Sequence, residues 1–172
     1  SLTKDDRSPV TVGDFAAQAV VARMLREKFP HDPLIGEENA DALRRDENRN
    51  VRETVAEFVR RIFSDATPEG VCDWIDRGGG RAEGRYWALD PIDGTKGFLR
   101  GDQYATALAL VADGQVRLGA LACPNLNGDS QNKEPAGSTG MVYSASRGDG
   151  AWAGPLADWA GGLSSDGRGD PP

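Results

Sequence analysis

Apolar residues recur along this chain at two different periods, one typical of helices and one typical of strands. Between residues 50 and 63 they return every three or four positions, with arginines and glutamates between them: Val51, Val55, Phe58, Val59 and Ile62. This spacing predicts an amphipathic helix that lies on a core. An earlier helix is predicted over residues 13–28, where good helix formers follow Thr11 and Asp14, spaced three apart as in a capping box.

Short apolar runs between turn residues predict the strands. Residues 104–112 and 115–123 are two such runs separated by Asp113 and Gly114, which is the signal for a hairpin with a type I′ turn. Further strands are expected at residues 33–36, 86–89 and 141–146, and residues 64–85 predict a connection with one helical turn near 71–75. We therefore expect an α+β domain in which helices are layered on a largely antiparallel sheet.

The domain predicted in this way covers residues 1–153. From residue 154 onward the chain is rich in Gly, Asp, Ser and Pro, which predicts a disordered tail over residues 154–172. A chain of 172 residues, 38% of them hydrophobic, can fill one core of ordinary size. No run approaches the roughly 18 apolar residues of a membrane span. Residues 1–10 lack the apolar segment of a signal peptide, so we expect a cytoplasmic protein with Cys72 and Cys123 as free thiols.

The charge balance restricts the partners. A net charge of −7 and a pI near 4.7 argue against polymeric nucleic acid, because such binding needs a basic stripe that replaces counterions. A small anion can still bind where a metal ion, main-chain N–H groups or a few cations such as Lys96 and Arg100 meet its charge. The expected partner is therefore a small phosphorylated molecule, and neither a nucleic acid polymer nor a membrane.

Candidate chemistry gathers directly after the predicted strand 86–89. Two carboxylates and a hydroxyl follow this apolar run within six residues, on Asp90, Asp93 and Thr95. If these carboxylates meet Glu37 or Glu38 at the end of the predicted strand 33–36, three or four negative oxygens converge, and only a hard cation can hold them together. Mg²⁺ is the candidate cation.

The simpler interpretation of Asp90 and Asp93 is a turn or a helix cap, which the pattern DPxDG also fits. Thr95 and Gly94 favour a phosphate ligand instead. The threonine hydroxyl can reach the same ligand as the second aspartate, and glycine lets the main chain approach an anion closely. A helix that began here would also direct its N-terminal N–H groups at the phosphate.

The remaining acidic candidates have structural alternatives of their own. Glu37 and Glu38 are adjacent, so in an extended strand they point to opposite faces and only one of them can bind the metal directly. The other holds a metal-bound water or faces solvent. Asp14 fits the first turn of a helix, where the helix dipole favours a carboxylate.

His31 is the single histidine, and it is expected in an exposed loop between two residues of turn type. A histidine general base is therefore not expected. The mechanism that fits the remaining residues is attack by a water molecule that Mg²⁺ activates. The sequence contains no GxxxxGKS or GxxxxGKT loop, so it does not indicate a P-loop nucleoside triphosphatase.

Three motifs resemble those of the lithium-sensitive, magnesium-dependent phosphomonoesterase superfamily that includes the inositol monophosphatases. They are GEEN at residues 36–39, WALDPIDGTKGFLRG at 87–101 and SPVTVGDFAAQ at 8–18. The DPxDGT core marks the superfamily. The continuation KGFLRG, the opening SPVT and the residues 123–126 are similar to the 3′(2′),5′-bisphosphate nucleotidase branch.

This resemblance implies a role for each candidate. Mg²⁺ would be bound by Glu37, Asp90, Asp93 and the main-chain carbonyl of Ile92, with a water between the metal and Glu38. The attacking water would be oriented by Asp14 and Thr95, and the scissile phosphate would be contacted by Gly94 and Thr95. The implied reaction is in-line hydrolysis of the 3′-phosphate of adenosine 3′,5′-bisphosphate or its 5′-phosphosulfate relative, a step in sulfur assimilation.

The resemblance covers residues 2–152 and corresponds to the N-terminal lobe of the family's fold. The family's second half carries a further metal-binding aspartate in a Trp-Asp motif, and Asp158 and Trp159 stand here in the reverse order, so they receive no such role. Two alternatives stay open: an inositol or sugar phosphate phosphatase with the same metal core, and a non-catalytic fragment that only binds metal or nucleotide. A sheet without its covering lobe would expose an apolar surface, so self-association is also expected.

Overall fold

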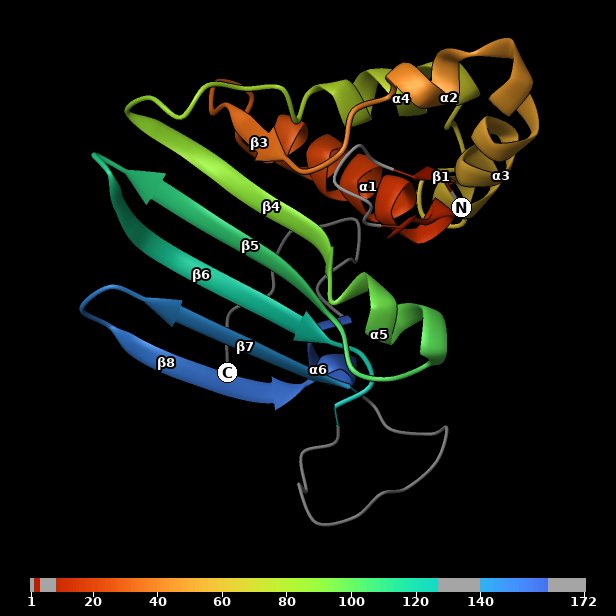
Figure 1. Ribbon diagram of the computed structural model, residues 1–172. Helices are drawn as coiled ribbons and strands as arrows, with labels where there is room; N and C mark the ends of the chain where they lie inside the picture. Colours follow the sequence, from red (N-terminus) through yellow and green to blue (C-terminus); the bar gives the residue numbers. More distant parts are fainter. Residues whose placement is uncertain (1, 4–8, 127–139, 161–172) are drawn as a thin grey trace.

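The fold is a six-stranded mixed sheet with helices packed against it (Figure 1). The computed structural model describes residues 2–3, 9–126 and 140–160. In spatial order the strands are β3 (Leu34–Gly36), β4 (Arg85–Asp93), β5 (Ala105–Ala112), β6 (Gln115–Cys123), β7 (Met141–Ser146) and β8 (Gly150–Pro155). A separate antiparallel pair consists of β1 (Leu2–Thr3) and β2 (Pro9–Val10). The helices are α1 (Val12–Lys28), α2 (Asp41–Arg44), the 3₁₀ turn η1 (Asp46–Asn48), α3 (Arg49–Arg60), α4 (Pro68–Asp76), α5 (Thr95–Arg100) and α6 (Leu156–Ala160).

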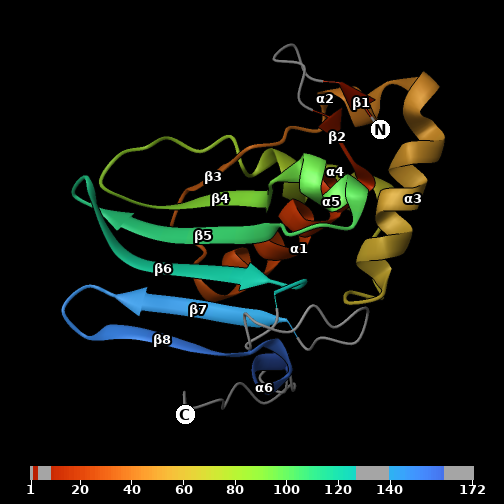
Figure 2. The same ribbon diagram turned by 60° about the horizontal axis from the view of Figure 1, so that its bottom comes forward.

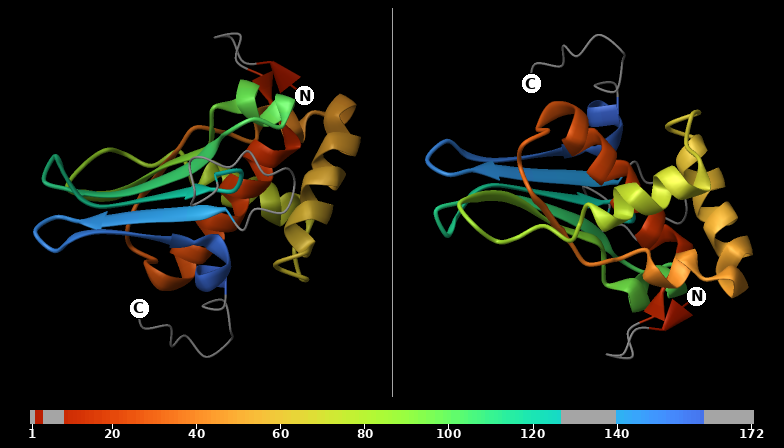
Figure 3. Two further views of the ribbon diagram at one scale, coloured as in Figure 1. Left: turned by 90° about the horizontal axis from the view of Figure 1, so that it is seen from below. Right: turned by 90° about the horizontal axis from the view of Figure 1, so that it is seen from above.

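Strand pairing confirms the predicted α+β domain with a largely antiparallel sheet. Only β3 and β4 run parallel within the six-stranded sheet, and every other neighbouring pair is antiparallel. The predicted hairpin is formed by β5 and β6, and its turn residues Asp113 and Gly114 have φ of 53° and 70°. Positive φ at both positions is what a type I′ turn requires. This hairpin turn and the β7–β8 turn lie at the end of the sheet opposite α5 (Figure 3).

The register of the strands separates two faces of the sheet. One row across the strands is Leu34, Trp87, Leu110 and Leu118, and these side chains pack with α1 residues such as Leu25 in a buried apolar cluster. The neighbouring row belongs to the other face and consists of Ile35, Ala88, Ala109, Gly119, Ala145 and Ala151. Side chains alternate along a strand, so the two rows lie on opposite faces of the sheet. Helix α1 covers the first face, and the second face carries mainly small residues.

Helix α1 also forms the centre of a second buried cluster, on its side away from the sheet. Figure 2 shows α1 between the sheet and α3. Its side chains Phe15 and Ala19 pack with buried residues of α2, α3 and α4, including Leu43 and Val59. A helix with apolar residues on two sides therefore joins the sheet to the outer helices. Within the described residues, no helix is long and apolar enough to cross a membrane.

Several boundaries differ from those expected from the sequence. Helix α4 is longer than the single turn expected near residues 71–75. Thr67 caps it by accepting a hydrogen bond from the Gly70 N–H at 3.0 Å, and Pro68 occupies its first turn. The expected tail from residue 154 is wrong for its first residues, since residues 154–155 belong to β8 and residues 156–160 form α6. Pairing with β7 orders this stretch despite its polar composition. Residues 161–172 lie outside the described part.

Leu43 provides a test of the outer cluster. Its side chain is fully buried in α2, so Leu43→Ala should leave a cavity and lower the free energy of unfolding by about 2–5 kcal/mol. Urea unfolding followed by circular dichroism measures this change. The control Ile62→Ala removes a side chain that is 53% exposed and should change stability by less than about 1 kcal/mol. Equal losses for both variants would contradict the assigned core.

Candidate metal centre

Two parallel strands bring carboxylates to the same edge of the sheet. Gly36, the last residue of β3, pairs with Leu89 of β4, so Glu37 and Asp90 are the next residues on the two strands. Side chains two apart in a strand point to the same face, so Glu37 is on the face of Ile35, and Asp90 is on the face of Ala88. Both belong to the face opposite α1, where their carboxylates share a hydrogen bond.

A bulge in β4 aligns Asp93 with Asp90. The two aspartates are three positions apart in sequence, whereas their partners on β5, Ala107 and Ala105, are only two positions apart. A regular strand would point side chains three apart to opposite faces, and one extra residue returns them to the same face. Pro91 fits this bulge because it has no N–H to place in a ladder, and its carbonyl accepts a hydrogen bond from the Thr106 hydroxyl at 2.8 Å.

The main chain turns sharply directly after the bulge. Gly94 has φ of +87°, a conformation that side chains with a Cβ rarely adopt, and α5 begins at the next residue, Thr95. The Thr95 hydroxyl donates a hydrogen bond of 3.1 Å to the carbonyl of Ile92. A helix does begin directly after Gly94, and Thr95 lines the same hollow as the carboxylates.

These two segments enclose a hollow of about 280 Å³. Six of the predicted site residues line it together with a lysine: Glu37, Asp90, Ile92, Asp93, Gly94, Thr95 and Lys96. Acidic oxygens, a main-chain carbonyl, a hydroxyl and one ammonium group thus surround the same small volume. Such a set can hold a hard cation and an anion next to one another.

Asp90 is the carboxylate of the site whose pKa is raised. Burial chiefly raises its pKa from 3.8 to about 6, and the charge of Glu37, the hydrogen bond with Glu37 and the charge of Asp93 add to the effect. Its Oδ1 atom is buried and has no hydrogen-bond partner among the described residues. An unsatisfied buried oxygen among other oxygens fits Mg²⁺, which prefers oxygen ligands.

The carboxylates are close but are not arranged around a single point. Among the described residues, no three His, Cys, Asp or Glu side chains form a group that could already hold a metal ion. Glu37 and Asp90 contact each other instead. Glu37, Asp90 and the exposed Asp93 are the carboxylates that would hold a cation here, and its positive charge would offset their mutual repulsion.

Asp14 and Glu38 do not line the hollow. Asp14 is buried at the start of α1, where its Oδ2 accepts hydrogen bonds from the Thr11 N–H at 2.8 Å and from the Thr11 hydroxyl at 2.6 Å. The predicted capping box is therefore confirmed. The start of α1 does lie against the site, since a Cβ on Gly13 would come within 2.9 Å of the Ile92 side chain. Asp14 as an orienting group for water stays a prediction.

Glu38 is buried on the face that α1 covers, so the expected alternative that it faces solvent is wrong. Its main chain is held by Gln18, a residue of α1 to which the sequence analysis assigned no role. A signal was present in the sequence. Gln18 lies three residues after Phe15 and four before Ala22, so a polar side chain occupies the apolar stripe of the predicted helix.

The raised pKa of Asp90 predicts a pH dependence of stability in the metal-free protein. Between pH about 4 and about 6 the folded protein keeps a proton on Asp90 that the unfolded chain has released. Linkage then makes the free energy of unfolding fall as pH rises through this window, whereas below pH 4 the group makes no difference. Asp90→Asn should remove this decrease, because an amide does not ionise.

Urea titrations in EDTA at pH 4, 5, 6 and 7 measure the effect. Asp102→Asn is the matched control, because Asp102 is an exposed carboxylate that pairs with Arg100 and lies outside the hollow. It should keep the slope of the wild type. If Asp90→Asn and the wild type lost stability equally between pH 4 and 6, the assigned environment of Asp90 would be wrong.

Comparisons with known proteins identify relatives of this chain. The profile of the inositol monophosphatase family matches residues 1–156. The 3′(2′),5′-bisphosphate nucleotidase of Schizosaccharomyces pombe is 47% identical over 165 residues, which are 88% of this chain and 46% of that protein. The 3′(2′),5′-bisphosphate nucleotidase 1 of Arabidopsis thaliana is 40% identical over 87% of this chain and 47% of its own length. The chain thus spans about half the length of the curated relatives it matches.

A solved structure supports the fold. The structure described as IMPase/NADP phosphatase complexed with Mg²⁺ and phosphate superposes with a TM-score of 0.51 at 21% identity, over 88% of this chain and 40% of that one. The helices on a six-stranded sheet are therefore the arrangement found in that fold. Because the family profile matches residues 1–156 of the 172 in this chain, the chain belongs to the inositol monophosphatase family.

Proposed function

We propose that this chain carries the metal and phosphate site of a Mg²⁺-dependent phosphomonoesterase that removes the 3′-phosphate of adenosine 3′,5′-bisphosphate or of its 5′-phosphosulfate relative. The observation that carries the proposal is the hollow where Glu37, Asp90 and Asp93 meet the Ile92 carbonyl and Thr95. The relatives named 3′(2′),5′-bisphosphate nucleotidase, at 40–47% identity, support the substrate class.

The proposed ligands of Mg²⁺ are Glu37, Asp90, Asp93 and the carbonyl of Ile92, whereas Glu38, which does not line the hollow, is not among them. When bound, Mg²⁺ lowers the pKa of a coordinated water and neutralises the phosphate oxygens. The buried, unpartnered Oδ1 of Asp90 supports this assignment, because a cation would supply the positive charge that this oxygen lacks.

The chain's other groups orient the reactants. The Thr95 hydroxyl and the main-chain N–H groups at Gly94 and Thr95 are proposed to hold the scissile phosphate, with the ammonium of Lys96 beside it. Asp14 and Thr95 are proposed to orient the attacking water for in-line displacement. The contact of the α1 start with Ile92 supports this role, because it brings the first turn of that helix against the site.

Asp93→Asn tests the assignment of the catalytic centre. It removes one negative ligand from the exposed side of the hollow, so phosphate release from adenosine 3′,5′-bisphosphate in Mg²⁺ should fall by at least about 10–100-fold. Release is measured colorimetrically with and without Li⁺. Asp102→Asn carries the same chemical change outside the hollow and should release phosphate at the wild-type rate.

Turnover that does not respond to Asp93→Asn would reject this site. A panel with inositol monophosphate separates the substrate classes, because preference for inositol monophosphate over the nucleotide would overturn the nucleotidase assignment. A second candidate function, binding of metal and nucleotide without turnover, is favoured by one observation, that the chain spans about half of its curated relatives. Calorimetric binding without phosphate release would support that candidate.

We also propose that the chain associates with itself through the sheet face opposite α1. Within the described residues this face forms an apolar hollow of about 720 Å³, and Leu121 and Tyr143 on it are 43% and 36% exposed. Apolar patches of this kind favour association. Multi-angle light scattering at about 100 µM should show species larger than the monomer, and Leu121→Lys should shift them toward the monomer because a charge resists burial.

Val116→Lys is the matched control, since Val116 is an apolar residue of the same strand, is 55% exposed and lies outside the hollow. It should leave the size distribution unchanged. A wild type that is monomeric at this concentration would contradict association through this face.

A further inference from the structure

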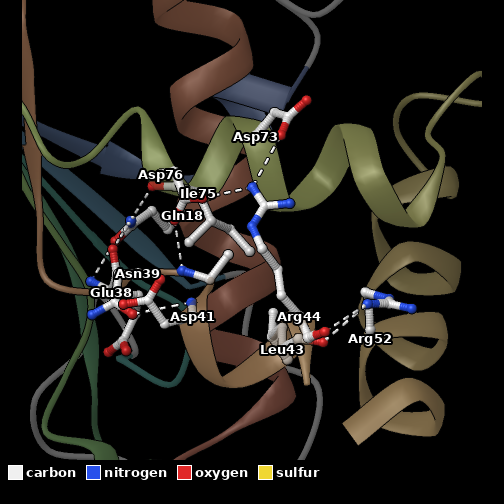
Figure 4. A network of polar contacts seen from close by, with 11 residues as sticks. Gln18, Glu38, Asn39, Asp41, Leu43, Arg44, Arg52, Asp73, Ile75 and Asp76 are labelled. Atoms are coloured by element: carbon white, nitrogen blue, oxygen red, sulfur yellow. Dashed lines mark hydrogen bonds and ion pairs between the residues drawn. The ribbon is translucent and has the colours of Figure 1, made fainter. Parts of the chain in front are cut away.

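We propose that Gln18 is a positioning residue of the metal centre, whose buried amide fixes the main chain around Glu37. The inference rests on the proposed metal site and adds to it a residue that would never touch the metal. Figure 4 shows Gln18 of α1 beside Glu38 and Ile75, with the segment that follows Glu38 held by Asp76.

Both ends of the Gln18 amide form hydrogen bonds with main-chain groups. Its side chain has no exposed surface, and its Nε2 donates hydrogen bonds to the carbonyls of Glu38 at 2.6 Å and Ile75 at 2.8 Å. Its Oε1 accepts a hydrogen bond from the Glu38 N–H at 2.9 Å. A buried amide is costly unless such bonds are made, so this position selects one arrangement of the two neighbouring segments.

The two hydrogen bonds between Gln18 and Glu38 extend the strand-like pairing past the end of β3. A strand partner exchanges one N–H and one carbonyl with the residue opposite, and the Gln18 amide makes the same exchange with Glu38. On the other side of Glu37, the Gly36 N–H donates to the Gly78 carbonyl at 2.8 Å. The main chain is thus held by hydrogen bonds on both sides of Glu37.

Two glycines make room for this amide. A Cβ on Gly36 would come within 2.5 Å of Gln18 Oε1, and a Cβ on Gly78 would come within 2.6 Å of Gln18 Nε2. Real Cβ atoms do not approach so closely. The glycine before the two glutamates and the first of the three glycines after α4 therefore belong to the same arrangement as Gln18.

A second side chain holds the far end of the segment. The Oδ1 atom of Asp76 accepts a hydrogen bond from the Ala40 N–H at 2.7 Å. Its Oδ2 atom forms an ion pair with Arg44 at 2.6 Å. The main chain from Gly36 to Ala40 is thus held by α1, by α4 and by the loop after α4. Metal ligands that are supported in this way keep their geometry, and loss of a supporting group typically weakens metal binding about 10–100-fold.

The test separates positioning from stability. Mn²⁺ binding to the full chain is measured by electron paramagnetic resonance, in parallel with urea unfolding. Gln18→Met keeps the size of the side chain and removes all three hydrogen bonds, so it should weaken Mn²⁺ binding by about 10–100-fold. Gln18→Glu keeps the acceptor for the Glu38 N–H, loses both donors and should fall between Gln18→Met and the wild type.

Leu25→Ala is the control for destabilisation, because Leu25 is a buried residue of α1 that packs in the cluster with the sheet residues Leu34 and Trp87. It should lower stability and leave the Mn²⁺ affinity unchanged. Asp93→Asn reports on the metal site itself. If it weakens Mn²⁺ binding and a folded Gln18→Met does not, the site stands and the role of Gln18 is overturned.

The remaining outcomes also decide the inference. If the wild type binds no Mn²⁺, or Asp93→Asn binds it equally well, the metal site is wrong and the inference falls with it. If both Gln18 variants unfold where Leu25→Ala stays folded, Gln18 serves the fold as a whole, and the positioning role is overturned.

Discussion

Two carboxylates that share a hydrogen bond, those of Glu37 and Asp90, are the constraint on which the site depends. They meet because β3 and β4 run parallel, so the carboxyl ends of both strands reach one edge of the sheet. Like charges at such a distance repel unless a proton or a cation lies between them. The burial of Asp90 strengthens this repulsion, and its unpartnered oxygen shows that the described side chains do not compensate it.

The fold serves this site through features that look structural when taken singly. The bulge at Pro91 and Ile92 turns Asp93 to the face of Asp90. The alternation along the β3 end sends Glu37 to the open face and Glu38 to the face that α1 covers. There, Gln18 binds the Glu38 main chain and contributes to the helix packing at the same time. The helix that joins the two apolar clusters is therefore also the support of the acidic segment.

Much of this arrangement was predictable from local patterns. The helix at α1, the type I′ hairpin and the strands at β3 and β7 follow from capping, turn and periodicity signals. The motifs around residues 36–39 and 87–101 indicated the family that the comparisons confirm. Six of the eight predicted site residues, including Glu37, Asp90 and Thr95, line one hollow.

Other features depend on contacts that a local pattern does not contain. The length of β4 was missed, because its aspartates resemble the turn that ends a strand, whereas pairing with β5 carries the strand through them. The order at residues 154–160 comes from pairing with β7 and from α6. The role of Gln18 depends on two segments about 20 and 57 residues away in sequence, which only the folded chain brings to its amide.

The central claim is that the oxygens of Glu37, Asp90, Asp93 and Ile92 surround one divalent cation. A crystal structure of the full chain grown with Mn²⁺, with anomalous scattering data, tests it most directly. We expect one strong anomalous peak at metal–ligand distance, about 2 Å, from the three carboxylates and the carbonyl. Strong Mn²⁺ peaks elsewhere on the chain, with none between Glu37 and Asp90, would contradict it.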